Sequence, residues 1–491
     1  MKTTFFSFCI LLLVSVPQAY PITVSSKNFT ESYILAEIFS KKIKDDFPEH
    51  EINRKLGMGG TGILFGALTN GDIDFYPEYT GTIAEAILKR PELKELSEIN
   101  KALLPLGLIV SKSLGFSNTY AFAVKKETAA KYLINNISDL VALPDLRYGF
   151  SYEFLKRNDG YYALAEKYGL KNTNVKGMAH GLAYEAIESG SVDLIDVYST
   201  DAKIKRFDLH ILDDNLEFFP RYDAVILANI NFVKEYPELW LHLKSLEGKI
   251  NGPEMVKLNA LVELGNYTFK DSAASFFTPF SATDKERKIN FGQIWSKTRE
   301  HLFLVFVSLL LAVFVGVPLG YLATCSGWLR HSIFAVSGIV QTIPSLALLC
   351  FFVPILGIGL APTLTALFLY GLLPIVRNAC IGLESIDNKL KETSQVLGLK
   401  KMQSLLWIEI PLSMPNIIAG IKTAAVINVG TATLAAFIGC GGLGSFIVTG
   451  LALNDINTIL HGAIPAAILA LILQYLFDVA DRFLIPKGIR S

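Results

Sequence analysis

The sequence predicts two domains, a soluble α/β domain with two lobes followed by an all-α transmembrane domain with five spans. The chain of 491 residues is 51% hydrophobic and has a mean hydropathy of +0.39, which is too apolar for an ordinary soluble protein. Charged residues are concentrated in residues 21–290, whereas long uncharged runs follow His301. The formal net charge of +0 is an average over two unlike halves, and no concentrated basic face is expected for a nucleic-acid partner.

Residues 1–20 have the features of a secretory signal peptide. Lys2 gives a positive start, Phe5–Val16 form an apolar stretch, and Gln18-Ala19 offers a small residue for cleavage. The apolar stretch is shorter than the about 20 residues of a membrane span. Because the cleavage site is imperfect, a retained anchor is the alternative. Either outcome places the following residues outside the cytoplasm.

Residues 21–280 are expected to form the α/β domain, because strand-like and helix-like patterns alternate along them. This alternation favours two lobes, with chain crossings near residues 122 and 223. A cleft between two such lobes can close about a hinge onto a ligand. The predicted strands are Ile22–Ser26, Glu51–Leu56, Ile73–Tyr76, Tyr120–Val124, Arg147–Phe150, Asp193–Tyr198 and Asp223–Ala228, and the predicted helices include Glu31–Lys44, Gly62–Thr69 and Gly181–Glu188.

Residues 281–300 are expected to be a polar linker, and residues 301–491 the transmembrane domain. Runs with at most one charged side chain are long enough for five spans of about 20 residues each. The longest run has 45 residues, roughly 67 Å of helix, so it is expected to hold two spans that reverse in its Pro- and Gly-containing part, residues 354–362. The spans are predicted within His301–Thr324, Ser332–Val376 (two spans), Asn416–Ile438 and Gly462–Phe477, the last extending towards Leu484.

Basic residues that flank the spans predict the orientation of the chain. They gather at one end of the spans, whereas the connectors 355–361 and 439–461 at the other end contain no Lys or Arg. The chain is therefore expected to be a multi-pass protein of the cytoplasmic (inner) membrane, with the α/β domain outside and the C-terminus inside. The basic residues are Arg330, Arg377, Lys389, Lys391, Lys400, Lys401, Arg482, Lys487 and Arg490.

The polar segment 384–415 between the third and fourth spans carries a spaced motif. Glu392, Gly398, Ile408 and Pro411 stand in the pattern E-x(5)-G-x(9)-I-x-I-P. Small residues after the glutamate let a short helix fit a groove on another protein, the glycine permits a turn, and the proline begins the return to the membrane. The pattern resembles the EAA coupling loop of ABC importer permeases, with Thr-Ser in place of Ala-Ala. A solvated amphipathic loop is the alternative.

The resemblance to importer permeases implies a transport subunit, not an enzyme. No phosphate-binding G-x-x-x-x-G-K-[ST] sequence occurs in the chain. A separate ABC ATPase subunit is therefore implied, and no cofactor is expected on this chain. Since one chain offers one coupling loop and five spans, a permease homodimer with two copies of the ATPase is the expected assembly.

Further motifs occur in both halves of the chain. In the membrane half they are His301–Val305, Gly316–Gly320, Ala435–Gly444 and Gly462–Pro465, and in the α/β half they are Ser26–Glu31, Gly59–Thr61, Gly71–Gly81, Asn118–Tyr120, Tyr198–Asp201 and Phe218–Tyr222. They resemble the glycine betaine/carnitine/choline (quaternary-amine) family of ABC importers. Gly149–Leu155 and His180–Tyr184 resemble its branch with ergothioneine and low-affinity betaine receptors. The resemblance implies a type II periplasmic-binding-protein fold and ATP-driven uptake of glycine betaine, choline, carnitine or ergothioneine, serving osmoprotection or redox-metabolite scavenging.

The resemblance also implies an aromatic cage for the ligand. A trimethylammonium group carries a positive charge but no N–H donor, so the faces of aromatic rings within about 6 Å are suited to hold it. The candidates carried over from the matching motifs are Tyr76 or Tyr79, Tyr120, Tyr198 and Tyr222. The alternative for each tyrosine by itself is a half-buried packing position.

A ligand carboxylate would need hydrogen-bond donors. Gly60 and Thr61 stand where a strand gives way to a helix, a place for free backbone N–H groups. Asn28, Thr30 and Arg221 are further candidates, and Asp201 would offset the cation or bond an imidazole ring. The alternatives are a tight turn, helix caps and a surface charge.

Three alternatives remain: two other classes of protein and an importer with a different substrate. A membrane-anchored enzyme would need a catalytic constellation, but the histidines of the α/β half are isolated and the five cysteines are scattered singly, so neither a nucleophile nor a metal site is expected. A ligand-gated channel-like receptor would have no need of the Glu392–Pro411 pattern. An importer of a different amino-acid-like solute is the third alternative, and the identity of the quaternary amine stays open.

Overall fold

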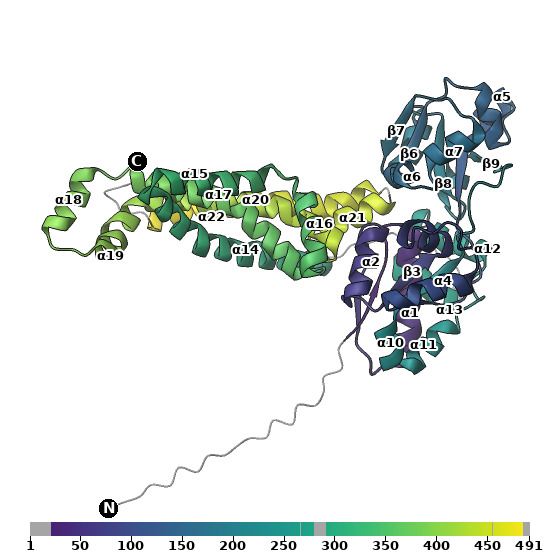
Figure 1. Cartoon of the computed structure of the whole chain (residues 1–491), viewed down its shortest axis with the longest axis horizontal. Coiled ribbons are helices and arrows are strands. Elements are labelled where there is room, and N and C mark those ends of the chain that lie inside the picture. The colour runs from purple at the N-terminus through teal and green to yellow at the C-terminus, as the bar shows by residue number, and fades with distance from the viewer. Residues whose placement is uncertain (1–20, 266, 279–290, 454, 485–491) are drawn as a thin grey trace, which may run out of the picture.

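The computed structural model describes residues 21–265, 267–278, 291–453 and 455–484. An α/β domain precedes a bundle of long helices that extends away from it (Figure 1). The predicted signal peptide and most of the predicted linker lie outside the described residues. Residues 291–300, predicted as the end of the linker, are helical instead.

The first lobe of the α/β domain is built on a five-stranded sheet with the order β2-β1-β3-β10-β4. β1 is parallel to β2 and β3, whereas β10 is antiparallel to β3 and β4. β1, β3 and β10 are buried along their whole length, as expected of a sheet covered on both faces. The strands are β1 (Ile22–Ser25), β2 (Ile52–Lys55), β3 (Phe75–Tyr79), β4 (Leu108–Val110) and β10 (Ala224–Asn229), and the helices are α1 (Thr30–Asp46), α2 (Thr61–Asn70), α3 (Thr80–Thr82), α4 (Leu96–Leu103), α10 (Ile230–Glu235), α11 (Pro237–Lys244), α12 (Gly252–Glu263) and α13 (Phe269–Phe277).

The second lobe has its own five-stranded sheet, with the order β7-β6-β8-β5-β9. The chain crosses between the lobes through residues 111–119 and 213–223, so the first crossing precedes the predicted position near residue 122. Short strands β4, β7 and β9 were not predicted. The elements are β5 (Tyr120–Lys125), β6 (Tyr148–Ser151), β7 (Val175–Met178), β8 (Leu194–Tyr198) and β9 (Leu209–Leu212), with α5 (Lys126–Tyr132), α6 (Tyr152–Lys156), α7 (Tyr161–Tyr168), α8 (His180–Glu188) and α9 (Lys203–Arg206).

The second domain is entirely helical in its described residues. Four of its helices are long and apolar enough to cross a membrane, or five when the pair α15 and α16, bent by 99°, counts as one span. The predicted five spans therefore agree with the upper count. The helices are α14 (Phe291–Cys325), α15 (Gly327–Thr342), α16 (Ser345–Leu356), α17 (Leu360–Glu384), α18 (Asn388–Val396), α19 (Lys401–Ser404), α20 (Ile410–Ala432), α21 (Gly444–Leu453) and α22 (Ile456–Leu484).

The helical domain departs from the predicted spans in two places. The second span is not continuous, because the chain bends at Pro344, which has no N–H to continue a helix. The predicted reversal is present at Gly357 and Gly359, which adopt φ of 73° and 93°. The predicted connector 439–461 contains a further apolar helix, α21.

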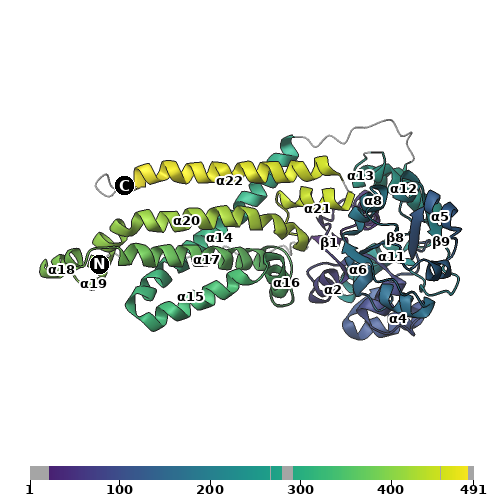
Figure 2. The same cartoon turned by 90° about the horizontal axis from the view of Figure 1, so that it is seen from above.

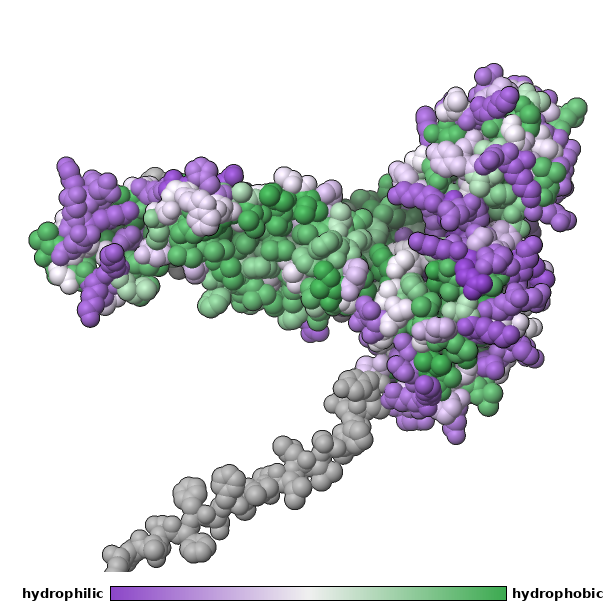
Figure 3. All heavy atoms as spheres, in the orientation of Figure 1, coloured by the Kyte–Doolittle hydropathy of each residue, from purple (hydrophilic) through white to green (hydrophobic). Residues whose placement is uncertain are grey.

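The surface of the helical domain is divided by polarity. Figure 3 shows a hydrophobic face along the bundle, with hydrophilic residues at the end that carries α18 and α19 and on the α/β domain. This pattern is the one expected of a bundle surrounded by lipid between two aqueous sides.

Both lobes contact the helical domain. In the first lobe, Asp72 Oδ2 accepts a hydrogen bond of 3.3 Å from the backbone N–H of Ile358. In the second lobe, Gly181 lies against the Leu451 carbonyl, 2.9 Å from where a Cβ would stand. Figure 2 shows α2 beside α16, and α8 beside α21, at this junction.

Candidate ligand-binding site and coupling loop

Four tyrosines line one cavity within the described α/β domain. Tyr79 ends β3 in the first lobe, and Tyr222 lies on the second crossing segment. Tyr120 begins β5 and Tyr198 ends β8, and the antiparallel register places these two directly opposite each other. The site is thus assembled where the two lobes meet.

The aromatic rings are close enough to surround one small cation. The centroid of the Tyr120 ring is 5.2 Å from that of Tyr198 and 5.8 Å from that of Tyr222. Phe29 completes the group, with its centroid 5.6 Å from Tyr198 and 6.2 Å from Tyr79. The cavity that they line measures about 30 Å³, so a trimethylammonium group reaches these ring faces only when a side chain such as Arg157 moves aside.

Two polar residues of the first lobe, Lys27 and Thr82, line the same cavity. Lys27 carries an ammonium group and Thr82 a hydroxyl. Lys27 Nζ lies 2.6 Å from Glu78 Oε1 and 5.8 Å from the centroid of the Tyr79 ring. Both ions of this pair are buried. The ammonium group retains further N–H donors that a ligand carboxylate can use.

The second lobe contributes Arg157, whose side chain is also buried. Its guanidinium forms an ion pair of 2.5 Å with Asp159. Its Cζ atom lies 5.5 Å from the centroid of Tyr120 and 5.7 Å from that of Tyr222, so these rings already hold a cation. Glu153, 3.8 Å from Arg157, adds a carboxylate to the cavity wall.

Glu31 on α1 joins the two lobes behind the rings. Its carboxylate accepts hydrogen bonds from side chains of both lobes and of the first crossing segment, and burial raises its pKa although these bonds oppose the shift. The donors are Tyr79 Oη (2.5 Å), Asn118 Nδ2 (3.0 Å), Thr200 Oγ1 (2.5 Å) and Asn259 Nδ2 (3.2 Å). Glu31 therefore fixes the Tyr79 ring and the position of the second lobe together.

Asp201 lies behind the ring of Tyr198. It accepts hydrogen bonds from the Tyr198 backbone N–H (3.0 Å) and the Tyr184 hydroxyl (2.5 Å), and it lies 3.0 Å from His180 Nε2. The His180 ring stacks on Tyr198, with centroids 4.3 Å apart. Asp201 is thus placed to hold His180 and Tyr198, and it does not line the cavity among the residues described for it.

The charge on His180 gives a pH-dependent prediction. Burial alone lowers the pKa of His180, but Asp201 and Asp196 overcome this effect and raise the pKa from 6.5 to about 10. The stabilisation by the imidazolium is therefore complete below pH 6.5 and is lost as the pH rises through about 10. We expect His180→Gln to lower the apparent Tm of the full chain by roughly 3–12 °C at pH 6, since losing a hydrogen bond to a charged, half-buried partner costs about 1.5–3 kcal/mol.

The measurement is thermal unfolding of both proteins between pH 6 and 11, where the difference in Tm should disappear at the upper end. His210→Gln is the matched control, because His210 Nε2 has no hydrogen-bond partner among the described residues. A Tm difference that is independent of pH would show that His180 acts by packing alone.

Several residues predicted for the site do not line the cavity. Tyr76 is fully buried in the core of the first lobe, on the opposite face of β3 from Tyr79. Asn28 and Arg221 are exposed, and Arg221 pairs with Asp223 at 3.1 Å. Thr30 is buried at the start of α1, beside Glu263. Gly60 and Thr61 begin α2 and line a different cavity, one that faces the helical domain.

The residues that sequence reasoning missed are the charged ones, Lys27, Glu153 and Arg157, together with Phe29, Thr82 and Asn118. Lys27, Phe29, Asn118 and Glu153 stand inside the motifs Ser26–Glu31, Asn118–Tyr120 and Gly149–Leu155, so these motifs were a signal for them. No local pattern distinguishes Arg157 from a surface arginine, because Asp159 and the rings that bury it come together only in the folded chain.

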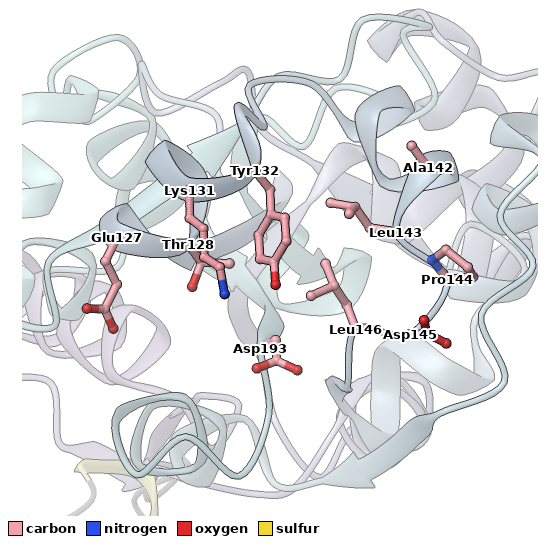
Figure 4. Close-up of a pocket in the computed structure, with 10 residues that line it drawn as sticks. All are labelled: Glu127, Thr128, Lys131, Tyr132, Ala142, Leu143, Pro144, Asp145, Leu146 and Asp193. Carbon is pink, nitrogen blue, oxygen red and sulfur yellow. The ribbon is translucent and has the colours of Figure 1, made fainter.

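A second hollow, of about 580 Å³, lies on the second lobe away from the tyrosine site (Figure 4). It is lined by α5 and by the turn before β6. Of its ten described lining residues only Tyr132 is aromatic. One ring cannot surround a quaternary ammonium group, so this hollow does not have the character of the tyrosine site.

The predicted coupling loop forms two short helices at the far end of the bundle. Gly398 lies between α18 and α19 with φ of 78°, a conformation that favours glycine, and Pro411 stands in the first turn of α20. Ser394, at the second alanine position of the motif, is buried against Ser404, with 2.8 Å between the two hydroxyl oxygens. Glu392 is exposed and Ile408 is half-buried. The loop also exposes the large apolar side chains Leu390, Val396, Leu397, Met402, Leu406 and Trp407.

Comparisons with known proteins agree with this geometry. Residues 20–278 match the substrate-binding domain of ABC-type glycine betaine transport systems, and residues 316–489 match the inner membrane component of binding-protein-dependent transport systems. The helical domain is 41% identical over 202 residues to the glycine betaine/carnitine/choline transport system permease protein of Bacillus subtilis, covering 41% of this chain and 93% of the relative.

Two further relatives each match about half of the chain. The ergothioneine transport permease/ergothioneine binding protein of Helicobacter pylori is 38% identical over 255 residues, covering 50% of this chain and 45% of the relative. The carnitine transport binding protein of Listeria monocytogenes is 34% identical over 271 residues, covering 52% of this chain and 86% of the relative. The chain is a multi-pass inner-membrane transport subunit, and it belongs to the glycine betaine/carnitine/choline/ergothioneine ABC importer family as a permease fused to its substrate-binding domain.

Proposed function

We propose that this protein takes up a small zwitterion that carries a trimethylammonium group and a carboxylate, such as glycine betaine, carnitine or ergothioneine. The observation that carries the proposal is one cavity with four tyrosines and with Lys27, Thr82 and Arg157 in its wall. The two kinds of group suit the two charged ends of such a molecule.

The tyrosine rings would hold the ammonium end. The ring faces supply negative potential without requiring an N–H donor, which a trimethylammonium group lacks. In the structure the Arg157 guanidinium packs over Tyr120 and Tyr222. A bound ammonium group would take its place there, and the guanidinium would turn towards the ligand carboxylate.

Lys27, Thr82 and Arg157 would hold the carboxylate end. Charge-assisted hydrogen bonds from lysine and arginine are about twice as strong as neutral ones. Because these donors come from both lobes, a carboxylate between them would draw the lobes together. Choline, which has a hydroxyl in place of the carboxylate, would lose this contribution.

The transport assembly would be a homodimer of this chain with two copies of a separate ATPase subunit. The exposed apolar side chains of the coupling loop support a protein partner at this end of the bundle. The basic residues near the same end favour the cytoplasm, and the α/β domain would then face the outside. ATP binding to the partner would act through residues 384–415 on the spans.

Calorimetric titration of the purified full chain with glycine betaine, carnitine, ergothioneine and choline tests the ligand class. We expect one of the three zwitterions to bind at least tenfold more tightly than choline, because the loss of one charge-assisted contact costs about 1.5–3 kcal/mol. Lack of binding to all four would contradict the quaternary-amine assignment. Equal affinity for choline would contradict the role given to Lys27, Thr82 and Arg157.

A further inference from the structure

A large hollow lies between the binding domain and the permease domain. It measures about 1050 Å³ and is lined by both lobes and by the permease helix α16. The first lobe contributes residues 60–63 at the start of α2 together with Glu85, Ala86 and Lys89, and the second lobe contributes Tyr152, Glu153 and residues 156–159. We call this hollow the vestibule.

The permease side of the vestibule is one face of a helix. Leu346, Cys350, Val353 and Pro354 line it, and their spacing of four, three and one residues places them on the same side of α16. Ile355 lies on the opposite side of α16, Phe351 lies between that side and the vestibule face, and both are exposed on the surface of the bundle. A single helix therefore has one face towards the vestibule and another on the exposed surface of the bundle.

The vestibule and the tyrosine site share a wall. Glu153 and Arg157 line both cavities. Arg157 closes the wall by packing on Tyr120 and Tyr222, and its Nη1 lies 3.5 Å from Thr82 Oγ1 of the other lobe. A movement of residues 152–159 that carries Glu153 and Arg157 away from this wall would therefore connect the two cavities.

We propose that the vestibule receives the zwitterionic ligand when it leaves the tyrosine site, with residues 152–159 as the gate and α16 as the permease surface it meets. The proposal rests on the proposed function and adds the route of transfer. The gate side of the vestibule has both acidic and basic side chains, Glu153 and Asp159 with Lys156 and Arg157. As a zwitterion passes these side chains, its ammonium group can pair with a carboxylate while its carboxylate pairs with a basic group, so neither charged end is left unpaired.

The Thr61 hydroxyl supports a polar occupant on the side of the first lobe. Its oxygen is buried and has no hydrogen-bond partner among the described residues. Thr61 also begins α2, whose first backbone N–H groups lack partners within the helix. A carboxylate that passes the gate would meet donors on this side.

Filling the vestibule tests the route. We expect Leu346→Trp to lower uptake of the ligand by cells at least tenfold while the affinity of the full chain, measured by titration, stays within twofold of the parent protein. Ile355→Trp, on the opposite face of the same helix, should leave both uptake and affinity unchanged. Normal uptake by the Leu346→Trp protein would overturn the proposal.

A covalent probe tests the vestibule without any transport ligand. The reagent is [2-(trimethylammonium)ethyl] methanethiosulfonate, which forms a disulfide with a thiolate, releases methanesulfinate and leaves a trimethylammonium group attached. In a full chain with Cys9, Cys325, Cys380 and Cys440 replaced by serine, Cys350 should react from the outside. In the same background, Phe351→Cys combined with Cys350→Ser should react at least tenfold more slowly in the membrane, because the proposed assembly places this exposed surface of the bundle in lipid, where the reactive thiolate is not formed.

The two tests separate the failure of the route from the failure of the proposed function. If the full chain binds none of the four ligands, the proposed function is wrong, but the reaction of Cys350 still reports whether the vestibule is open to a trimethylammonium group. If a zwitterion binds and Cys350 is no more reactive than the cysteine at position 351, the function stands and the route is wrong.

Discussion

Replacing Tyr198 by alanine is expected to weaken binding of the trimethylammonium ligand about thirtyfold. Tyr198 contacts the other rings of the site through Tyr120 and Phe29, at centroid separations of 5.2 and 5.6 Å. A cation–π contact in a desolvated site contributes about 2 kcal/mol, and every 1.4 kcal/mol changes the dissociation constant tenfold. Calorimetric titration of the full chain measures the change.

Two further variants show whether the ring face or the hydroxyl of Tyr198 matters. Tyr198→Phe keeps the ring stacked on His180 and should stay within threefold of the parent affinity. Tyr132→Ala removes an exposed tyrosine of the same lobe, far from the site, and should have no effect. A large loss with Tyr198→Phe, or none with Tyr198→Ala, would contradict an aromatic cage.

The strands that hold the site could be predicted because their sequence pattern is strong. β5, β8 and β10 are rich in β-branched, aromatic and aliphatic residues, and each is buried over most of its length. β3 has the sequence Phe-Tyr-Pro-Glu-Tyr, and the strand predicted there, Ile73–Tyr76, ended before Tyr79. The missed strands β7 and β9 are short and only partly buried, and each lies at an edge of its sheet. Edge strands carry a weak hydrophobic signal because part of their surface faces water.

The tyrosines that line the cavity were predicted more completely than its charged residues. Separate motifs identified Tyr120, Tyr198 and Tyr222, and the structure brings these together with Tyr79. The sequence alone could not decide between Tyr76 and Tyr79. The two are three positions apart, so their side chains point to opposite faces of β3. Only the fold shows which face of the strand meets the second lobe.

The charged residues were missed for a different physical reason. A lone Lys or Arg in a sequence is expected at the surface, because burying an unpaired charge is costly. Lys27 and Arg157 are buried because Glu78 and Asp159 pair with them. Asp159 follows Arg157 by two positions, but Glu78 is far from Lys27 in the sequence, and neither pairing is predictable without the fold.

The second large effect of a substitution, on uptake and on binding of the ATPase subunit, is expected at the coupling loop. Val396 at the end of α18 is 87% exposed, so Val396→Asp should leave the fold intact. In the proposed assembly this side chain lies against the ATPase subunit, where an unpaired carboxylate would be desolvated. We expect the variant to lose the co-purifying ATPase subunit and to lower uptake at least tenfold, while the affinity for the ligand stays unchanged.

The matched control applies the same change on the other side of the membrane. Leu241 on α11 of the binding domain is 69% exposed, and Leu241→Asp should affect neither uptake nor retention of the ATPase. The comparison separates a lost interface from a general effect of a new surface charge, because both variants replace an exposed apolar side chain with a carboxylate. Retention of the ATPase by the Val396→Asp protein would mean that the subunit docks elsewhere on the loop, and normal uptake would remove the loop from the transport mechanism.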